Sequence, residues 1–353
     1  MITKRSKRIL MALLGLTLVV VITLSWRKPG GIDPLPDAQV ELTRTVEGDV
    51  FKVDVEGNAY RVDKSSGKWR FVAKVFHPRE MLAAYVTDGD AVYRIDERDG
   101  KRFKTTRSLQ EDFEGLADGV EGLRQLIGPE RGWGSVTLQS PQTPTVPAYV
   151  ALRQKILKEG AAFQDAIVAP DSSRAHGGRT ALKCVAPAPT KGMITSKSSL
   201  SSPLIYFRKG DDVWFRAWYY AEETRPLTLM DLECEWIEQH GGIRLYLDEG
   251  GLLLAELKAL DKPKFKQSLT NAIPFPLDRW VNVRAHFLLS DDADGVIQIW
   301  QDGTLIVDQR GTTLPLPRAI YTSLEVGISA HSFGNRTATL WVDDVAVSSK
   351  PLE

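Results

Sequence analysis

The most regular pattern in the chain is an alternation with a period of two residues. Between Val213 and Tyr220 the odd positions are mainly apolar, whereas the even positions are aromatic or basic. Successive side chains of a β-strand point to opposite faces of a sheet. The pattern therefore predicts a strand with one buried face and one outward face that carries Trp214, Arg216, Trp218 and Tyr220.

Further strands with the same alternation follow. Residues 281–289 direct Asn282, Arg284 and His286 outward, and residues 296–301 direct Gln298 and Trp300 outward. Asp302-Gly303 predicts a tight hairpin turn into residues 305–308. Two more apolar runs predict the last strands, residues 324–328 and 339–347. Short strands separated by turn signals predict an all-β, antiparallel sandwich.

The amino terminus has the composition of a membrane anchor. Four basic residues within the first eight precede an uncharged apolar run, residues 9–26, which as a helix would span about 27 Å. The basic flank predicts that the bulk of the chain lies on the periplasmic or extracellular side. A cleaved signal peptide is the alternative. We expect a single-pass transmembrane helix in residues 1–27 and a Pro- and Gly-rich linker in residues 28–39.

Two further regions follow the linker. Residues 40–107 contain two aromatic and basic strand patterns that turn back at Gly57 and Gly100, which predicts a small β unit. Residues 108–353 form the main domain, and the spacing of apolar residues from Ala148 to Glu159 predicts one surface helix. Equal numbers of basic and acidic residues, 45 each, argue against a nucleic-acid partner.

Several motifs in this order resemble concanavalin A-like jelly-roll proteins. They include Gly-Gly-Arg-Thr-Ala-Leu-Lys at 177–183, Lys-Gly-Asp-Asp-Val-Trp-Phe at 209–215 and Trp-Val-Asp-Asp-Val at 341–345. Asp-Phe-Glu at 112–114, Asp-Arg-Trp-Val at 278–281 and the hairpin at 298–303 complete the set. Within that class the chain is most similar to the polysaccharide lyases of the heparin-lyase-like and alginate-lyase-like branch.

The resemblance implies that an extended polysaccharide lies across one sheet. Aromatic rings stack on sugars, and arginine pairs with uronate carboxylates. The expected substrate-binding residues are therefore aromatic, basic or amide-bearing: Trp214, Trp218, Arg244, Arg284, Gln298 and Trp300. The alternative is that these faces are reversed and the rings lie in the core.

β-Elimination from a uronate needs a group that neutralises the carboxylate, a base and an acid. The expected catalytic residues are Arg216 or Arg284 as neutraliser, His286 or His176 as base and Tyr220 or Tyr246 as acid. Each of them also has a purely structural interpretation.

The chain departs from the lyase pattern at one strand. Lyases of this class carry an Arg-x-Glu-Leu strand, and the matching stretch here is Lys197-Ser198-Ser199-Leu200. Lysine does not form the bidentate carboxylate pair that arginine makes. Glu233 and Glu235 share a strand face and are an alternative carboxylate pair for glycoside hydrolysis. A non-catalytic envelope protein that binds a glycan or a protein is the rival function.

A structural Ca²⁺ site is a further expectation. A jelly roll pairs its first and last strands, so Asp112 and Glu114 should approach Asp343 or Asp344. Ordinary edge and turn roles are the alternative. Cys184 and Cys234 are the only cysteines; a disulfide needs their strands to be neighbours, and two buried free thiols are the alternative.

Overall fold

The structure is a computed structural model. It describes residues 40–46, 49–54, 58–62, 66–74, 84–88, 91–95, 102–128, 130–193, 195–234, 241–258, 264–315, 319–332 and 334–352. The predicted membrane anchor and linker, residues 1–39, lie outside the described residues. In the ranges given above, no helix is both long and apolar enough to cross a membrane.

The chain divides into two compact units, residues 1–79 and 80–353. The first unit contains a four-stranded antiparallel sheet of consecutive hairpins. Its strands are β1 (Val40–Val46), β2 (Asp49–Asp54), β3 (Asn58–Val62) and β4 (Trp69–Lys74).

The second unit begins with a three-stranded antiparallel sheet. Its strands are β5 (Ala84–Asp88), β6 (Ala91–Ile95) and β7 (Arg102–Lys104). The sequence predicts one β unit over residues 40–107, and the strands described there fall into these two separate sheets.

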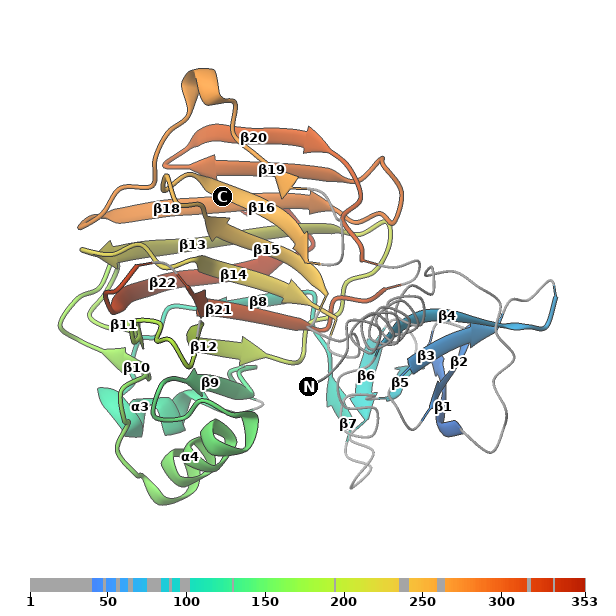
Figure 1. The fold of residues 1–353 in the computed structure, drawn as a ribbon, viewed down its shortest axis with the longest axis horizontal. Coiled ribbons are helices and arrows are strands. Elements are labelled where there is room, and N and C mark those ends of the chain that lie inside the picture. Colours follow the sequence, from blue (N-terminus) through green and yellow to red (C-terminus); the bar gives the residue numbers. More distant parts are fainter. Residues whose placement is uncertain are drawn as a thin grey trace, which may run out of the picture. The chain divides into compact units, whose positions relative to one another are not determined.

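The rest of the second unit is a sandwich of two antiparallel sheets, drawn as two layers in Figure 1. The first sheet has eight strands, of which seven run in the order β10-β11-β22-β13-β18-β19-β20, while β8 also pairs with β22. These strands are β8 (Ser108–Glu111), β10 (Ile167–Asp171), β11 (Ala181–Ala186), β13 (Asp212–Glu222), β18 (Trp280–Leu288), β19 (Val296–Gln301), β20 (Thr304–Arg310) and β22 (Ala338–Ser348).

The second sheet has seven strands in the order β17-β16-β15-β14-β21-β12-β9. They are β9 (Ser135–Gln139), β12 (Ser196–Ser202), β14 (Thr228–Glu233), β15 (Gly242–Leu247), β16 (Leu253–Lys258), β17 (Lys264–Phe265) and β21 (Ser323–His331). The all-β sandwich expected from the alternation is thus confirmed.

Two α-helices and a 3₁₀ turn accompany the sheets. Helix α3 (Gly119–Leu126) packs near β10, and α4 (Val146–Glu159) packs on β9. Thr145 caps α4 at its start, and Gly160 ends it in the left-handed conformation with φ 71°. The surface helix predicted over residues 148–159 is therefore confirmed. The 3₁₀ turn is η2 (Leu269–Asn271).

The expected faces of β13 and β18 are also confirmed. In β13, the odd positions from Val213 to Ala221 are fully buried, while the even positions are intermediate. In β18, Val281 to Phe287 bury their odd positions in the same way. The reversed assignment, with Trp214 and Trp218 in the dry core, is excluded.

The two cysteines lie in different sheets. Cys184 is in β11, and Cys234 directly follows β14. Both are buried, and they are not joined by a disulfide. Burial raises the pKa of the Cys184 thiol to about 12, so this thiol stays protonated at neutral pH. The free-thiol alternative is the one that the structure bears out.

Candidate functional site

A row of charged side chains crosses the outer face of the seven-stranded sheet. Asp231 of β14 lies opposite Glu325 of β21 on one side and Arg244 of β15 on the other. Arg244 in turn lies opposite Glu256 of β16. We call Glu325, Asp231, Arg244 and Glu256 the titratable row. The alternation that sends Leu232 into the core directs Asp231 to the other face.

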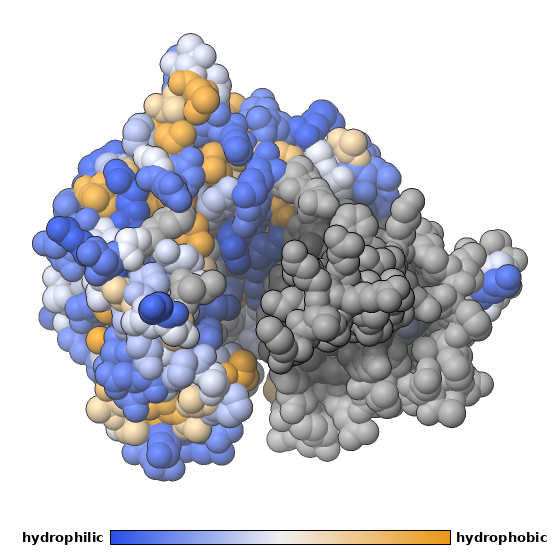
Figure 2. Space-filling view, in the orientation of Figure 1, coloured by the Kyte–Doolittle hydropathy of each residue, from blue (hydrophilic) through white to orange (hydrophobic). Residues whose placement is uncertain are grey.

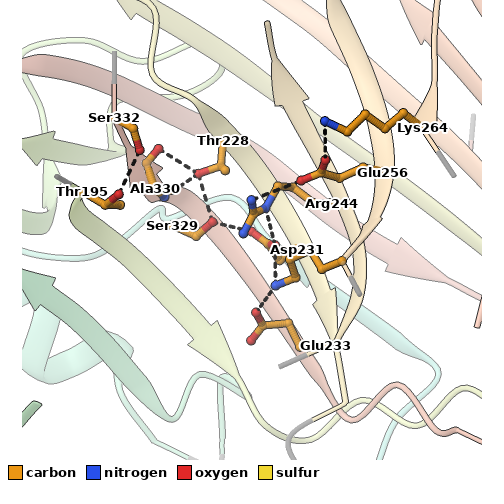
Figure 3. A network of polar contacts seen from close by, with 11 residues as sticks. Thr195, Thr228, Asp231, Glu233, Arg244, Glu256, Lys264, Ser329, Ala330 and Ser332 are labelled. Carbon is orange, nitrogen blue, oxygen red and sulfur yellow. Dashed lines mark hydrogen bonds and ion pairs between the residues drawn. The ribbon is translucent and has the colours of Figure 1, made fainter. Parts of the chain in front are cut away.

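Asp231 lies between Glu325 and Arg244 in this row, and Figure 3 shows its polar contacts with Arg244 and Ser329. Its side chain is 0% exposed, and its Oδ1 lies 2.7 Å from Lys258 Nζ and 3.1 Å from Arg244 Nε. Its Oδ2 accepts a hydrogen bond from Ser329. Lys258 also lies 2.5 Å from Glu233 Oε1. Gly242 stands between Glu233 and Lys258 in the strand register, so no side chain separates them.

The charges around Asp231 set its ionisation. Burial by itself raises the pKa of this carboxyl, but Lys258 and Arg244 outweigh it and hold the pKa well below its usual range. The pKa of Lys258 is raised: burial lowers it, but Asp231 and Glu233 outweigh burial. Asp231 and Lys258 are therefore both charged at neutral pH.

Glu325 behaves differently from its neighbour. Its carboxylate accepts a hydrogen bond from Ser199 of β12. Burial, followed by the negative charges of Glu233 and Asp231, raises the pKa of Glu325 to about 7, although Lys197 lowers it. A carboxyl group with such a pKa exchanges protons near neutral pH, as a general acid or base must.

Helix α4 brings two more groups to this part of the face. Arg153 donates a hydrogen bond to Ser135 Oγ of β9 at 2.5 Å. Burial raises the pKa of Tyr149; Arg153 lowers it and Glu325 raises it further, so this phenol lies within electrostatic range of both. Tyr149 is consequently a neutral phenol at pH 7, able to donate a proton.

Tyr246 lies two residues after Arg244 on β15. The side chain is buried, and burial raises the pKa of its phenol to about 12, with Glu256 contributing. Its side chain points to the same outer face as that of Arg244, because the two residues are two positions apart on one strand. Its register partner on β14 is Thr228. The face therefore combines cations, a carboxyl that titrates near pH 7 and two neutral phenols. In the orientation of Figure 1, the space-filling view shows a largely hydrophilic sandwich surface with scattered hydrophobic residues (Figure 2).

The predicted site residues divide between the two sheets. Arg244, Tyr246 and Glu233 lie on the seven-stranded sheet, in or beside the titratable row. Glu235 lies outside the described residues. The others belong to strands of the eight-stranded sheet, or to the turn beside it in the case of His176: Trp214, Arg216, Trp218, Tyr220, Arg284, His286, Gln298 and Trp300.

On the eight-stranded sheet the rings stack on one another. The ring of His286 stacks on Trp214 at 4.2 Å between centroids, and Trp214 stacks on Trp300 at 6.1 Å. His286 Nε2 lies 2.7 Å from Asp212 Oδ1, and its Nδ1 lies 3.1 Å from Gln298 Oε1. Both nitrogens of this expected base are thus engaged with neighbouring side chains.

The second expected base is held in a similar way. The ring of His176 stacks on Trp218 at 3.7 Å between centroids, and its Nδ1 lies 2.9 Å from Asp344 Oδ2. Tyr220 is covered by the guanidinium of Arg174, 3.8 Å from the ring centroid. On the surface of this sheet, His286, His176 and Tyr220 are therefore all packed against neighbouring side chains.

The expected approach of the terminal strands is present, since β8 pairs with β22. Glu114 accepts hydrogen bonds from the backbone amides of Arg179 and Thr180, and Asp343 accepts them from His176 and Gly177. The two carboxylates thus hold one turn from its two ends. The described residues contain no group of three or more potential metal-ligating side chains. A Ca²⁺ site at Asp112, Glu114 and Asp343 remains a prediction.

Sequence reasoning missed Glu325, Asp231, Lys258 and Tyr149. One signal pointed to this face: Lys197 and Ser199 occupy the expected lyase positions, and they lie in β12, beside Glu325. The sequence predicts the strand that contains Glu325. It does not indicate that β12 and β14 are the neighbours of this strand, because they are distant in sequence.

One family model matches part of the chain. Residues 172–346 match the family model described as polysaccharide lyase, a segment that includes the whole titratable row. No curated protein matches the chain.

The solved structures that match the chain share little sequence with it. An endo-β-1,4-glucuronan lyase from the fungus Trichoderma reesei is 14% identical with TM-score 0.47, covering 69% of this chain and 96% of that one. The cellulose-induced protein Cip1 is 17% identical with TM-score 0.45, covering 69% and 98%. The alginate lyase Aly36B is 8% identical with TM-score 0.43, covering 70% and 99%.

Proposed function

Starting from a chain that is polysaccharide lyase-like in family and fold, we propose that it cleaves a uronate-containing polysaccharide by β-elimination on the outer face of the seven-stranded sheet. The observation that carries the proposal is Glu325. This buried carboxyl titrates near pH 7 and is hydrogen-bonded to Ser199, in the strand that corresponds to Arg-x-Glu-Leu in the resembling lyases.

The position of Glu325 compensates for the departure at residue 199. Where the lyase pattern has a glutamate on β12, this chain has serine, and that serine donates a hydrogen bond to a glutamate of the adjacent strand β21. A carboxyl group is therefore retained at the same place on the face, supplied by a different strand.

The proposed reaction uses Lys197, Glu325 and Tyr149. Lys197 neutralises the substrate carboxylate and so acidifies the proton at C5. Glu325 as carboxylate takes that proton, the C5 electron pair forms the C4=C5 double bond, and the C4–O bond breaks. Tyr149 donates its proton to the leaving oxygen. Asp231 holds Lys258 and Arg244 in place beside the reacting sugar.

The test is an assay of the full-length protein on polyglucuronate, polymannuronate and polyguluronate. Elimination creates an unsaturated uronate, followed by its ultraviolet absorbance. We expect product from at least one polymer, a rate that rises with pH around pH 7, and a loss of at least 100-fold in Glu325→Gln.

His286→Gln is the matched control, because His286 is the expected base on the opposite sheet. This variant should retain activity within threefold. Loss of activity in His286→Gln with full activity in Glu325→Gln would move the reaction to the eight-stranded sheet.

A non-catalytic glycan-binding role is the second candidate. One observation favours it: Arg244 is shared between Asp231 and Glu256, and Lys258 between Asp231 and Glu233, so these cations are already neutralised. Retention on a uronate polymer without any unsaturated product would support this role over the enzyme.

We also propose that residues 1–27 anchor the protein in the membrane and leave the remainder on the periplasmic or extracellular side. The support is the basic flank followed by the uncharged apolar run. The full-length chain should sediment with membranes after an alkaline wash, and deletion of residues 1–27 should release it. Recovery of the full-length chain in the soluble fraction would contradict the proposal.

A further inference from the structure

Arg153 of helix α4 lies against β9, the last strand of the seven-stranded sheet. Its Nη1 donates hydrogen bonds to Ser135 Oγ at 2.5 Å and to the carbonyl oxygen of Val136 at 3.3 Å. Leu152 and Ile156 of the same helix are buried, and the helix packs on β9. Because Val136 points into the core, Ser135 points to the outer face. The guanidinium is therefore held on the face that carries the titratable row.

The strand register connects Arg153 to Glu325. Ser135 of β9 is the partner of Ser201 of β12, and Ser201 is the partner of Glu325 of β21. Neighbouring strands lie about 4.8 Å apart, so the backbone at Ser135 and the backbone at Glu325 are about 10 Å apart across the sheet. At this level of the sheet, β9 and β12 contribute only serine side chains to the outer face. Arg153 therefore continues the titratable row at its β9 end.

Arg153 has no acidic partner among the described residues. Arg244, in the same row, is paired with Asp231 and Glu256. The printed contacts of Arg153 are to a hydroxyl and a carbonyl oxygen, and both use Nη1, so Nε and Nη2 have no acceptor in the described part of the chain. Burial lowers the pKa of this guanidinium, although the Tyr149 phenol raises it in part. A partly buried cation of this kind is stabilised by an anion that comes from outside the chain.

We propose that Arg153 binds a second substrate carboxylate, on a sugar next to the one that loses its C5 proton to Glu325. The planar guanidinium matches the two oxygens of a carboxylate, and its Nε and Nη2 are the donors that remain for it. This inference rests on the proposed function and narrows its substrate class. The site favours polymers with uronates on consecutive sugars over polymers in which uronates alternate with uncharged sugars.

The kinetic constants of the full-length protein on polyglucuronate, polymannuronate and polyguluronate test this role. On the polymer that is cleaved, Arg153→Gln should raise KM about tenfold or more, the effect of losing hydrogen bonds to a charged group. The value of kcat should stay within about threefold, because this contact is the same before and during proton transfer. Lys155→Gln is the matched control: it removes a positive charge from an exposed position of the same helix and should leave both constants unchanged.

Ser135→Ala is the second variant, since it removes the hydroxyl that holds Nη1 and keeps the charge of Arg153. It should raise KM by a smaller factor, and its unfolding temperature should stay within a few degrees of wild type. If Arg153→Gln and Ser135→Ala both keep KM within about twofold of wild type, the second carboxylate contact is refuted. A large loss of kcat at unchanged KM in Arg153→Gln would also refute it.

The narrowed substrate class is tested with hyaluronan, in which glucuronate alternates with N-acetylglucosamine. Wild-type kcat/KM on the cleaved polyuronate should exceed the value on hyaluronan about tenfold or more. Equal and measurable values on the two polymers would refute the preference for consecutive uronates.

Direct binding separates this inference from the proposed enzyme. The full-length Glu325→Gln protein is titrated with tetrasaccharides of polyglucuronate and polymannuronate, and with cellotetraose as the neutral arm. Adding Arg153→Gln should weaken binding of at least one acidic tetrasaccharide about tenfold and leave cellotetraose binding unchanged. An equal loss for cellotetraose, or no binding of either acidic tetrasaccharide before Arg153 is changed, would refute the role of Arg153.

The two proposals can fail independently. If wild type yields no unsaturated product, but acidic tetrasaccharides bind and Arg153→Gln weakens them selectively, the proposed enzyme is refuted and Arg153 is supported as a carboxylate-binding residue. If wild type yields the product and Arg153→Gln changes neither KM nor tetrasaccharide binding, the enzyme is supported and the role of Arg153 is refuted.

Discussion

At the scale of single residues, two neighbouring carboxyl groups of the titratable row have opposite properties. Asp231 and Glu325 are register partners and both are buried. Asp231 contacts Lys258 and Arg244 directly, so its charge is stabilised. Burial raises the pKa of Glu325 and the negative charges of Glu233 and Asp231 raise it further, so its charge is destabilised despite the hydrogen bond from Ser199. The identity of the nearest partner decides the ionisation of each.

The raised pKa of Glu325 predicts a pH dependence of stability. The pKa rises from 4.5 to about 7 on folding, so the folded state binds the proton more tightly than the unfolded state between these values. Stability should therefore fall as pH rises from 4.5 to about 7. Glu325→Gln should remove this fall and gain about 1 kcal/mol or more at pH 8 relative to wild type.

Denaturant unfolding at pH 5 and pH 8 measures this effect. Glu121→Gln, which alters a carboxylate exposed on α3, is the control and should preserve the wild-type pH profile. An identical pH profile for Glu325→Gln and wild type would contradict the assignment.

Removal of the Asp231 charge should be strongly destabilising. Asp231→Asn leaves two cations without their shared partner, at a cost of about 3–5 kcal/mol at pH 7. Because folding depresses the pKa of Asp231, the wild-type stability due to this group is present above pH 3.8 and is lost as pH falls below it. The variant should lack this acid loss.

Urea unfolding at several pH values tests the prediction. Arg279→Gln breaks a pair that is 55% exposed on the arginine side, and it should cost less than about 1 kcal/mol. Equal effects of the two substitutions would show that the buried cluster is no stronger than a surface pair.

At the scale of elements, residues within a turn determine the hairpins, whereas tertiary contacts determine which strands are neighbours in a sheet. Asp302-Gly303 predicts the β19–β20 turn, and in the structure both residues have positive φ, 49° and 80°. Type I′ turns require this conformation at both central positions. By contrast, nothing in β12 indicates that its partners are β21 and β9, because the chain returns to it from distant segments.

Gly303 offers a test of the turn. A Cβ at Gly303 meets nothing within 4 Å, so the cost of Gly303→Ala comes from φ +80° alone, about 1 kcal/mol. Gly192 has equally open space and no positive φ, so Gly192→Ala is the matched control. Thermal unfolding should show a lower melting temperature for the first variant only; equal melting temperatures would rule out a turn-specific cost.

At the scale of the whole molecule, the two sheets are joined by their buried residues. Tyr219 of β13 buries its ring between the sheets, and its hydroxyl donates a hydrogen bond to the Leu229 carbonyl oxygen of β14 at 3.1 Å. Burial raises the pKa of this phenol well above its usual value, which keeps it a donor. This contact links the eight-stranded sheet to the seven-stranded sheet.

Tyr219→Phe should destabilise the sandwich by about 1–3 kcal/mol, because the carbonyl oxygen of Leu229 loses its partner in a dry environment. Tyr220→Phe, on the outer face of the same strand, should change stability by less than about 0.5 kcal/mol. Chemical denaturation of the two variants compares them directly; a larger effect at Tyr220 would contradict the inter-sheet role.

The sequence by itself determined the strands, their buried faces, the hairpin and the surface helix, because these depend on residues a few positions apart. It also placed Lys197 and Ser199 at a lyase-like strand. Only the tertiary structure decided that Glu325, 126 residues from Ser199, supplies the carboxyl there. It likewise placed Arg244 and Tyr246 in the seven-stranded sheet, whereas Trp214 and Trp218 lie in the eight-stranded sheet. Sheet assignment depends on long-range strand pairing, which the alternation of side chains does not encode.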